Sequence, residues 1–253
     1  MELDPQAILD RVMEAYATCV GYRDEGTVMS IVHRPEPRVV RGRFSTRFVR
    51  GRGFLIRAEQ QLNEQPPSRF AFWVNAKGES TNDWSTTPAR VWSDRRLPPW
   101  KDPSALEVHM FAGMMTAGAS GFVPPWLMPE LNSAPYPTRP REARPETDTD
   151  GAPTGRVVLT VLDSSRTRQE WTVDPASGLV HRIHLPRPTP DDLAMARAWL
   201  MTQLASAFGA ESAEARLRDP EMKPTEGEAT IEYAPAFVDD LDESELVFTP
   251  PET

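Results

Sequence analysis

The sequence has a single cysteine, and this scarcity excludes several kinds of site. Cys19 has no partner within the chain, so an intramolecular disulfide and a multi-cysteine metal site are both excluded. We expect Cys19 to be a buried residue on the first helix. His181 and His184 lie three residues apart on an expected strand, so they point to opposite faces, with His181 on the apolar one. His33 and His109 lack a second histidine or cysteine at ligand spacing, so no metal site is expected.

The motifs of common enzyme classes are also missing. The chain has no Gly-x-Ser-x-Gly, no phosphate-binding glycine loop and no His-Glu-x-x-His. Asp191 and Asp192 fit the first turn of a helix, and Asp239 and Asp240 belong to a solvated acidic run. We therefore expect no catalytic residue and no cofactor, while a catalytic site assembled from distant residues stays open.

Basic residues are fewer than acidic residues. A net charge of −9 and a pI near 5.1 argue against nucleic acid as a partner. One region departs from this balance, because residues 34–57 contain eight arginines and a single acidic residue, Glu36. A basic sheet face that binds anionic lipid headgroups is one interpretation. An ordinary solvated strand face is the other, and we favour it.

No apolar run is long enough to cross a membrane. A spanning helix needs about 20 unbroken apolar residues, whereas "GMMTAGASGFVPPWLMPEL" (113–131) is interrupted by glycines and prolines. The stretch predicts a helix over 104–117, with Asp102 as its cap, followed by an irregular apolar loop. Such a segment is suited to cover another apolar surface.

The first residues, "MELDPQAILDRV", lack the basic start and apolar run of a signal peptide. We therefore expect either a cytosolic protein or one whose targeting segment precedes Met1.

Alternating patterns dominate what is present. Asp4 and Pro5 predict the start of a first helix. After it, apolar residues recur with a period of two, which is typical of strands. The alternation places Phe44 and Phe48 on one face of a strand and Arg43 on the other. Strands are expected at 27–34, 39–50, 53–62, 69–78, 89–94, 155–164, 166–174, 179–185, 228–235 and 244–250.

Two segments interrupt this series. A proline-rich polar run at about 132–155 predicts a surface insertion, and an amphipathic pattern at about 189–209 predicts an added helix. Because strands follow one another instead of alternating with helices, the fold class is α+β with one curved antiparallel sheet, in a single domain over 1–253.

Several motifs, in their order, resemble the bacterial lipoprotein-carrier family (LolA and LolB). The helix followed by "GYRDEGTV" and "GRFSTRFVRGRGFLIRAEQ" is similar to its start. Arg50 and Phe54 keep the family's Arg-Pro-x-x-Phe spacing, with Gly51 in place of proline. "EWTVDPASGLVHRIHL" and "LDESELVFTPPE" resemble its strand–turn–strand and its closing strand.

The resemblance implies an unclosed β-barrel whose concave apolar face is covered by helices and holds acyl chains. It implies a non-enzymatic, monomeric protein of the periplasm or cell envelope that binds lipid or the acyl chains of lipoproteins, with an envelope protein as a further partner. A regulatory or scaffolding module of the same fold, which grips a protein partner, is the alternative. The ligand-binding residues expected on this basis are Phe44, Phe48, Phe54, Ile56, Phe70, Phe72, Met110, Met114, Met115 and Trp126.

Two roles stay open at this point. The segment 104–131 is either a movable lid over the cavity or a permanently packed part of the core. Arg50 is either a latch that binds backbone carbonyls of the lid, as the resemblance implies, or a solvated arginine at a strand end.

Overall fold

A computed structural model describes most of the chain. The described residues are 3–33, 37–74, 81–86, 89–95, 126–127, 139–162, 168–208 and 227–251.

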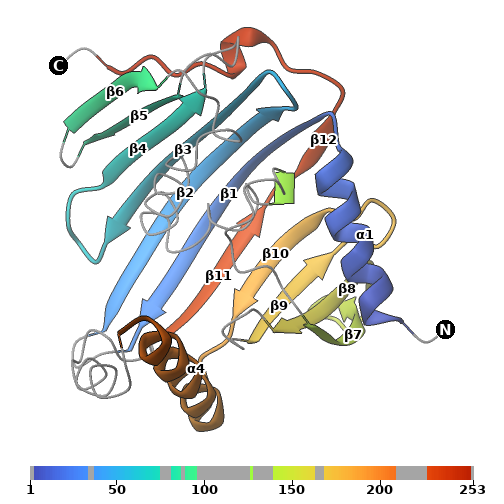
Figure 1. Ribbon diagram of the computed structural model, residues 1–253. Helices are drawn as coiled ribbons and strands as arrows, with labels where there is room; N and C mark the ends of the chain where they lie inside the picture. The colour runs from blue at the N-terminus through green and yellow to red at the C-terminus, as the bar shows by residue number, and fades with distance from the viewer. Residues whose placement is uncertain are drawn as a thin grey trace.

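The described strands form one twelve-stranded antiparallel sheet that curves but does not close (Figure 1). Their order is β6-β5-β4-β3-β2-β1-β11-β10-β9-β8-β7, with β12 paired to β1, so β6 and β7 are the two free edges. This confirms the predicted fold class. The bounds are β1 (Gly21–Val32), β2 (Arg38–Val49), β3 (Gly53–Leu62), β4 (Ser68–Val74), β5 (Thr81–Thr86), β6 (Ala89–Arg95), β7 (Arg139–Thr147), β8 (Pro153–Leu162), β9 (Arg168–Val173), β10 (Val180–Leu185), β11 (Gly227–Tyr233) and β12 (Ala236–Val238).

The helix α1 (Pro5–Thr18) packs on one side of the sheet, which we call the inner face; the opposite side is the outer face. Asp4 caps the helix by accepting a hydrogen bond from the Gln6 amide at 2.9 Å. Val12 and Tyr16 lie on its buried stripe, and the helix has its main contacts with β7 and β8. The Tyr16 hydroxyl also accepts the Val180 amide at 3.2 Å, which ties α1 to β10.

The turn between β9 and β10 also supports α1. Gly178 has a φ of +78°, a left-handed conformation that favours glycine, and a Cβ there would lie 2.9 Å from the Cβ of Ala15. Arg11 donates to the Ala176 carbonyl at 2.6 Å across the same contact. The predicted Asp174–Gly178 turn is therefore confirmed, and its glycine lets the helix approach closely.

The proline-rich run is the first correction. Residues 139–147, expected within a surface insertion, form the edge strand β7. Register shifts occur at Pro140 and Pro145, where the ladder to β8 is irregular. Proline cannot donate to a ladder, and edges and bulges are the places in a sheet that tolerate it.

The C-terminal segment is the second correction. Residues 244–250, expected to be a strand, form the end of the 3₁₀ turn η4 (Glu243–Glu245) and an extended segment without ladder pairing. The segment crosses the outer face, where Leu246 packs with Val49 and Leu241, and Phe248 packs with Trp73 and Trp84. We call residues 239–251 the C-terminal strap.

The expected helix near 189–209 is found as α4 (Pro190–Phe208), beside the sheet rather than across it (Figure 1). Thr189 and Asp192 hydrogen-bond to each other at its start. Neither α1 nor α4, the helices of the described part of the chain, has the length and apolar character needed to cross a bilayer.

Candidate functional site

Six of the expected ligand-binding residues lie together on the inner face of β2–β4. Strand register places Ala58 between Phe44 and Phe70, and Phe48 beside Phe54. The six side chains are at most 5% exposed and belong to one hydrophobic cluster. They are Phe44, Phe48, Phe54, Ile56, Phe70 and Phe72; we call them the aromatic patch. The period-two alternation of the sequence was sufficient to assign these side chains to one face of the sheet.

Trp126, a seventh expected residue, lies elsewhere on the inner face. Its ring packs edge-on to Tyr16 of α1, with centroids 5.2 Å apart, and against Trp171 of β9 at 4.8 Å. Only 3% of Trp126 is exposed, and Leu127 beside it is fully buried. This part of the 104–131 segment is therefore anchored between helix and sheet.

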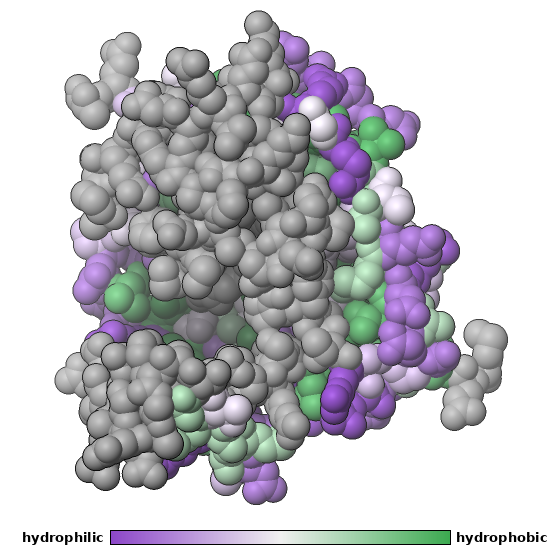
Figure 2. All heavy atoms as spheres, in the orientation of Figure 1, coloured by the Kyte–Doolittle hydropathy of each residue, from purple (hydrophilic) through white to green (hydrophobic). Residues whose placement is uncertain are grey.

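The other expected contacts from that segment, Met110, Met114 and Met115, lie outside the described residues, as does the helix predicted over 104–117. The space-filling view shows hydrophobic side chains at the floor of a hollow on the inner face, over the lower ends of β1 and β2 (Figure 2).

Arg50 binds backbone carbonyls, and those described belong to the end of α1. Its Nε–H donates to the Cys19 carbonyl at 3.0 Å, and a terminal nitrogen donates to the Tyr16 carbonyl at 3.1 Å. The guanidinium also lies over the Phe48 ring, 5.3 Å from its centroid. Arg50 thus joins the β2–β3 turn to the last turn of α1, and it is not a simply solvated arginine. Its role as a lid latch stays a prediction.

Cys19 is the C-cap of α1 and half-buried, so it is not the buried helical residue that was expected. Burial raises the pKa of its thiol, and the nearby Arg50 acts in the opposite direction.

A buried carboxyl group on the inner face was missed by sequence reasoning. Asp24 is 1% exposed, accepts the Tyr22 hydroxyl at 2.7 Å, and accepts the Thr46 amide at 2.8 Å. Burial raises its pKa to about 6, while these hydrogen bonds and Arg47 act to lower it. The expected strand began at residue 27, whereas β1 begins at Gly21, so the inward position of Asp24 was not recognised.

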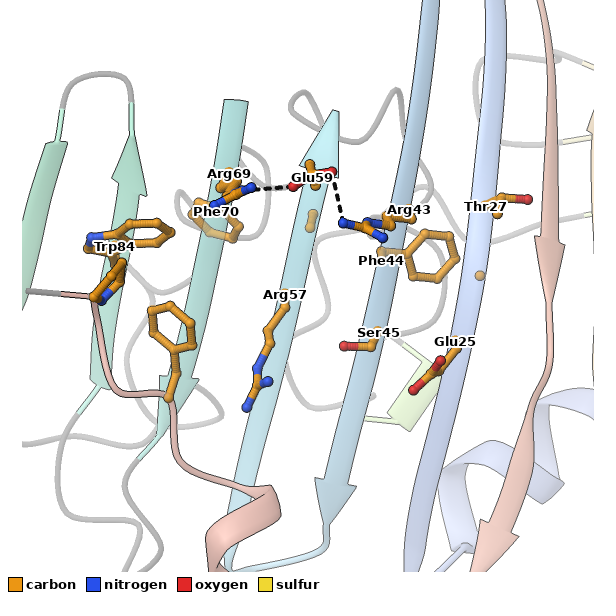
Figure 3. A pocket seen from close by; sticks show the side chains of 14 residues that line it. Glu25, Thr27, Arg43, Phe44, Ser45, Arg57, Glu59, Arg69, Phe70 and Trp84 are labelled. Atoms are coloured by element: carbon orange, nitrogen blue, oxygen red, sulfur yellow. Dashed lines mark hydrogen bonds and ion pairs between the residues drawn. The ribbon is translucent and has the colours of Figure 1, made fainter. Parts of the chain in front are cut away.

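The outer face contains a hollow of about 610 Å³ beside the C-terminal strap, which we call the outer groove (Figure 3). One part of its lining is apolar, from Trp84, Phe248 and Pro251, and the strand residues Gly26, Phe44, Ala58 and Phe70 also line it. The other part is polar and charged, with side chains from β1 to β4: Glu25, Thr27, Arg43, Ser45, Arg57, Glu59 and Arg69.

Several arginines of residues 34–57 form ion pairs with acidic residues of neighbouring strands and of the C-terminal strap. Arg43 pairs with Glu59 at 3.0 Å, and Arg47 pairs with Glu25 at 3.0 Å, both on the outer face. Arg52 pairs with Asp240 of the strap. Acidic residues from other strands therefore offset much of a charge that looks unbalanced along the sequence.

A second, smaller hollow of about 230 Å³ lies on the outer face over β8–β11 and is lined by polar residues that include Arg182, His184 and Glu232. His184 shares a hydrogen bond with Thr230 at 3.1 Å. The register shift between Val180 and Arg182 alters the alternation of β10, so Val180 and Ile183 are buried while His181 is only half-buried. In the described part of the chain, no group of three or more His, Cys, Asp or Glu could hold a metal ion.

No protein-family model and no curated protein matches this chain. Among solved structures, it is similar to a DUF1329 family protein from Desulfovibrio piger, with 9% identity, a TM-score of 0.34, and coverage of 97% of this chain and 98% of the other. It is also similar to a LolA superfamily protein from Nitrosomonas europaea, with 11% identity, a TM-score of 0.30, and coverage of 97% and 98%.

A third similar structure is a putative outer membrane lipoprotein-sorting protein domain from Vibrio parahaemolyticus, with 12% identity, a TM-score of 0.32, and coverage of 96% and 97%.

Proposed function

We propose that the protein is a non-enzymatic binder of lipid, or of the acyl chains of lipoproteins, and works in transport or sensing in the cell envelope. The observation that supports this most directly is the aromatic patch, which joins six apolar side chains of three neighbouring strands into one surface. α1 packs on β7 and β8, towards the other end of the strand order. The patch is therefore not the main docking surface of this helix.

The energetics of the proposal are favourable. Because the patch is buried, an acyl chain has to displace neighbouring groups or enter space beside them. Each buried methylene contributes about 0.8 kcal/mol, so ten buried carbons contribute about 8 kcal/mol. The free energy needed to open part of a folded protein ranges from near zero up to the global free energy of unfolding. Burial of an acyl chain would therefore offset an opening cost of a few kcal/mol.

Trp126 supports the alternative, a scaffolding module whose apolar interior is filled by its own side chains. Its ring occupies inner-face space between Tyr16 and Trp171. Native mass spectrometry of gently purified protein separates the two functions. A co-purifying acyl mass supports lipid binding, and a clean apo mass that stays unchanged after incubation with fatty acid supports the scaffold.

A matched pair of substitutions locates the acyl site. Ala58 lies between Phe44 and Phe70 in the aromatic patch, whereas Ala143 lies on β7 and packs on the part of the core near α1. Ala58→Leu should displace about two methylenes of ligand and weaken binding of a fluorescent fatty acid about tenfold. Ala143→Leu should bind as the wild type does.

Both variants are first checked for cooperative urea unfolding, because added core volume is itself destabilising. Equal affinities in two folded variants would contradict the aromatic patch as the acyl site.

A further inference from the structure

The outer groove combines an apolar end with a cluster of cations. Phe248 of the strap packs on Trp84 at 5.3 Å between ring centroids, which forms the apolar end with Pro251. The Arg57 guanidinium lies over the Phe248 ring, 5.5 Å from its centroid, and donates to the Val247 carbonyl at 3.4 Å. Arg57 therefore lies where the apolar and charged parts of the groove meet.

The charges of the groove do not balance. Glu59 lies between Arg43 and Arg69 and pairs with both, at 3.0 and 2.7 Å (Figure 3). Glu25 pairs with Arg47. Among the ion pairs of the described residues, none involves Arg57.

Other polar groups lie close to Arg57 on the same face. Ser45 is its register partner on β2, so its hydroxyl is a near neighbour on the outer face. Arg43 is the diagonal neighbour, two residues along β2. A guanidinium fork with a hydroxyl beside it suits an oxyanion.

We propose that the outer groove is a second binding site, for a small anionic amphiphile, that is, an acyl or aromatic group carrying a carboxylate or phosphate. The anion binds Arg57, Arg43 and the Ser45 hydroxyl, and the apolar body packs on Trp84, Phe248 and Pro251. A volume of about 610 Å³ suits such a ligand, since small-molecule sites usually span about 300–1,000 Å³. Strand alternation places the side chains of Arg43, Ser45 and Arg57 on the opposite face of the sheet from those of the aromatic patch, and the inference does not depend on the proposed function.

Two dyes that differ only in charge test the site. Anilinonaphthalene sulfonate carries an anionic group, and phenylnaphthylamine is the same ring system without it. Arg57→Gln should weaken sulfonate binding about tenfold, which equals about 1.4 kcal/mol, and leave the neutral dye unchanged. The matched control is Arg41→Gln, an exposed arginine on the same face of β2 that does not line the groove; its affinity should stay within about twofold of the wild type.

Two further measurements separate the groove from the inner face. Phe54→Leu, a change in the aromatic patch at a residue that does not line the groove, should leave sulfonate binding intact. The sulfonate should also slow hydrogen exchange of residues 246–249. Octanoate and octyl phosphate compete for the bound dye, and displacement by either one supports the site and identifies its anion. Equal loss in Arg57→Gln and Arg41→Gln, loss in Phe54→Leu, or displacement by neither competitor would overturn the proposal.

Discussion

At the scale of single residues, Asp24 lies in surroundings that are unusual for a carboxyl group. Its carboxyl group is buried between Tyr22 and Thr46 on an apolar face. Burial raises its pKa from 3.8 to about 6, so the folded state holds the protonated form more strongly than the unfolded chain does. The contribution of Asp24 to stability is therefore fully present below pH 3.8 and is lost as pH rises through about 6.

Asp24→Asn should remove this pH dependence. The free energy of unfolding of the variant, relative to the wild type, should rise by up to about 3 kcal/mol between about pH 4 and pH 7.5, since Asn cannot ionise. Urea unfolding at a series of pH values measures it. Asp174→Asn is the control of opposite sign, because hydrogen bonds from Ser177 and Ala176 lower the pKa of that carboxyl; this variant should lose relative stability as pH rises. Parallel pH profiles for Asp24→Asn and the wild type would contradict the assignment.

At the scale of elements, α1 is held to the sheet at its C-terminal end by the side chains of Arg50 and Tyr16. Arg50 follows β2 and binds the Tyr16 and Cys19 carbonyls, which lack helical partners at the end of α1. The ring of Tyr16 in turn packs on Trp126 in the core of the inner face. The position of Trp126 thus depends on a residue from a distant turn.

Arg50→Lys should destabilise the fold, because an ammonium group cannot reach both carbonyls in the planar geometry of a guanidinium. Hydrogen bonds to charged groups contribute about 1.5–3 kcal/mol, so we expect a loss of about 2 kcal/mol in urea unfolding. Arg52→Lys, which alters an ion pair on the surface with Asp240, is the matched control and should change stability by less than about 0.5 kcal/mol. Equal effects of the two changes would show that the carbonyl contacts contribute little.

The elements also show which features a sequence pattern can predict. Phe44 and Phe48 lie four residues apart on one strand, so their shared face follows from the period of two alone. The strand β7 cannot be predicted from the local pattern, because prolines such as Pro140 and Pro145 normally interrupt strands. They are tolerated here because β7 lies at the edge of the sheet. Phe248 has the pattern of a strand residue, but its partners Trp73 and Trp84 are remote in sequence and engage its ring rather than its backbone.

At the scale of the whole molecule, the two faces of the sheet are covered by segments from opposite ends of the chain. α1 lies on the inner face, and the C-terminal strap lies on the outer face over β2–β5. Arg52 and Arg57 bind the strap through Asp240 and the Val247 carbonyl. Closing one face at the start of the chain and the other at its end makes the stability of the sheet depend on contacts between residues far apart in sequence.

The strap should therefore contribute to global stability through its buried anchor, Leu246. This side chain is fully buried against Val49 and Leu241 and contacts Gly53 at the β2–β3 turn. Leu246→Ala should lower the free energy of unfolding by about 2–4 kcal/mol, since it removes buried methyl groups and leaves a cavity. Its neighbour Val247 is 38% exposed, so Val247→Ala should cost less than about 1 kcal/mol. Denaturant unfolding of both variants measures the difference. If Leu246→Ala lost no more stability than Val247→Ala, the strap would be a loosely attached tail, and its role as a wall of the outer groove would lose its structural support.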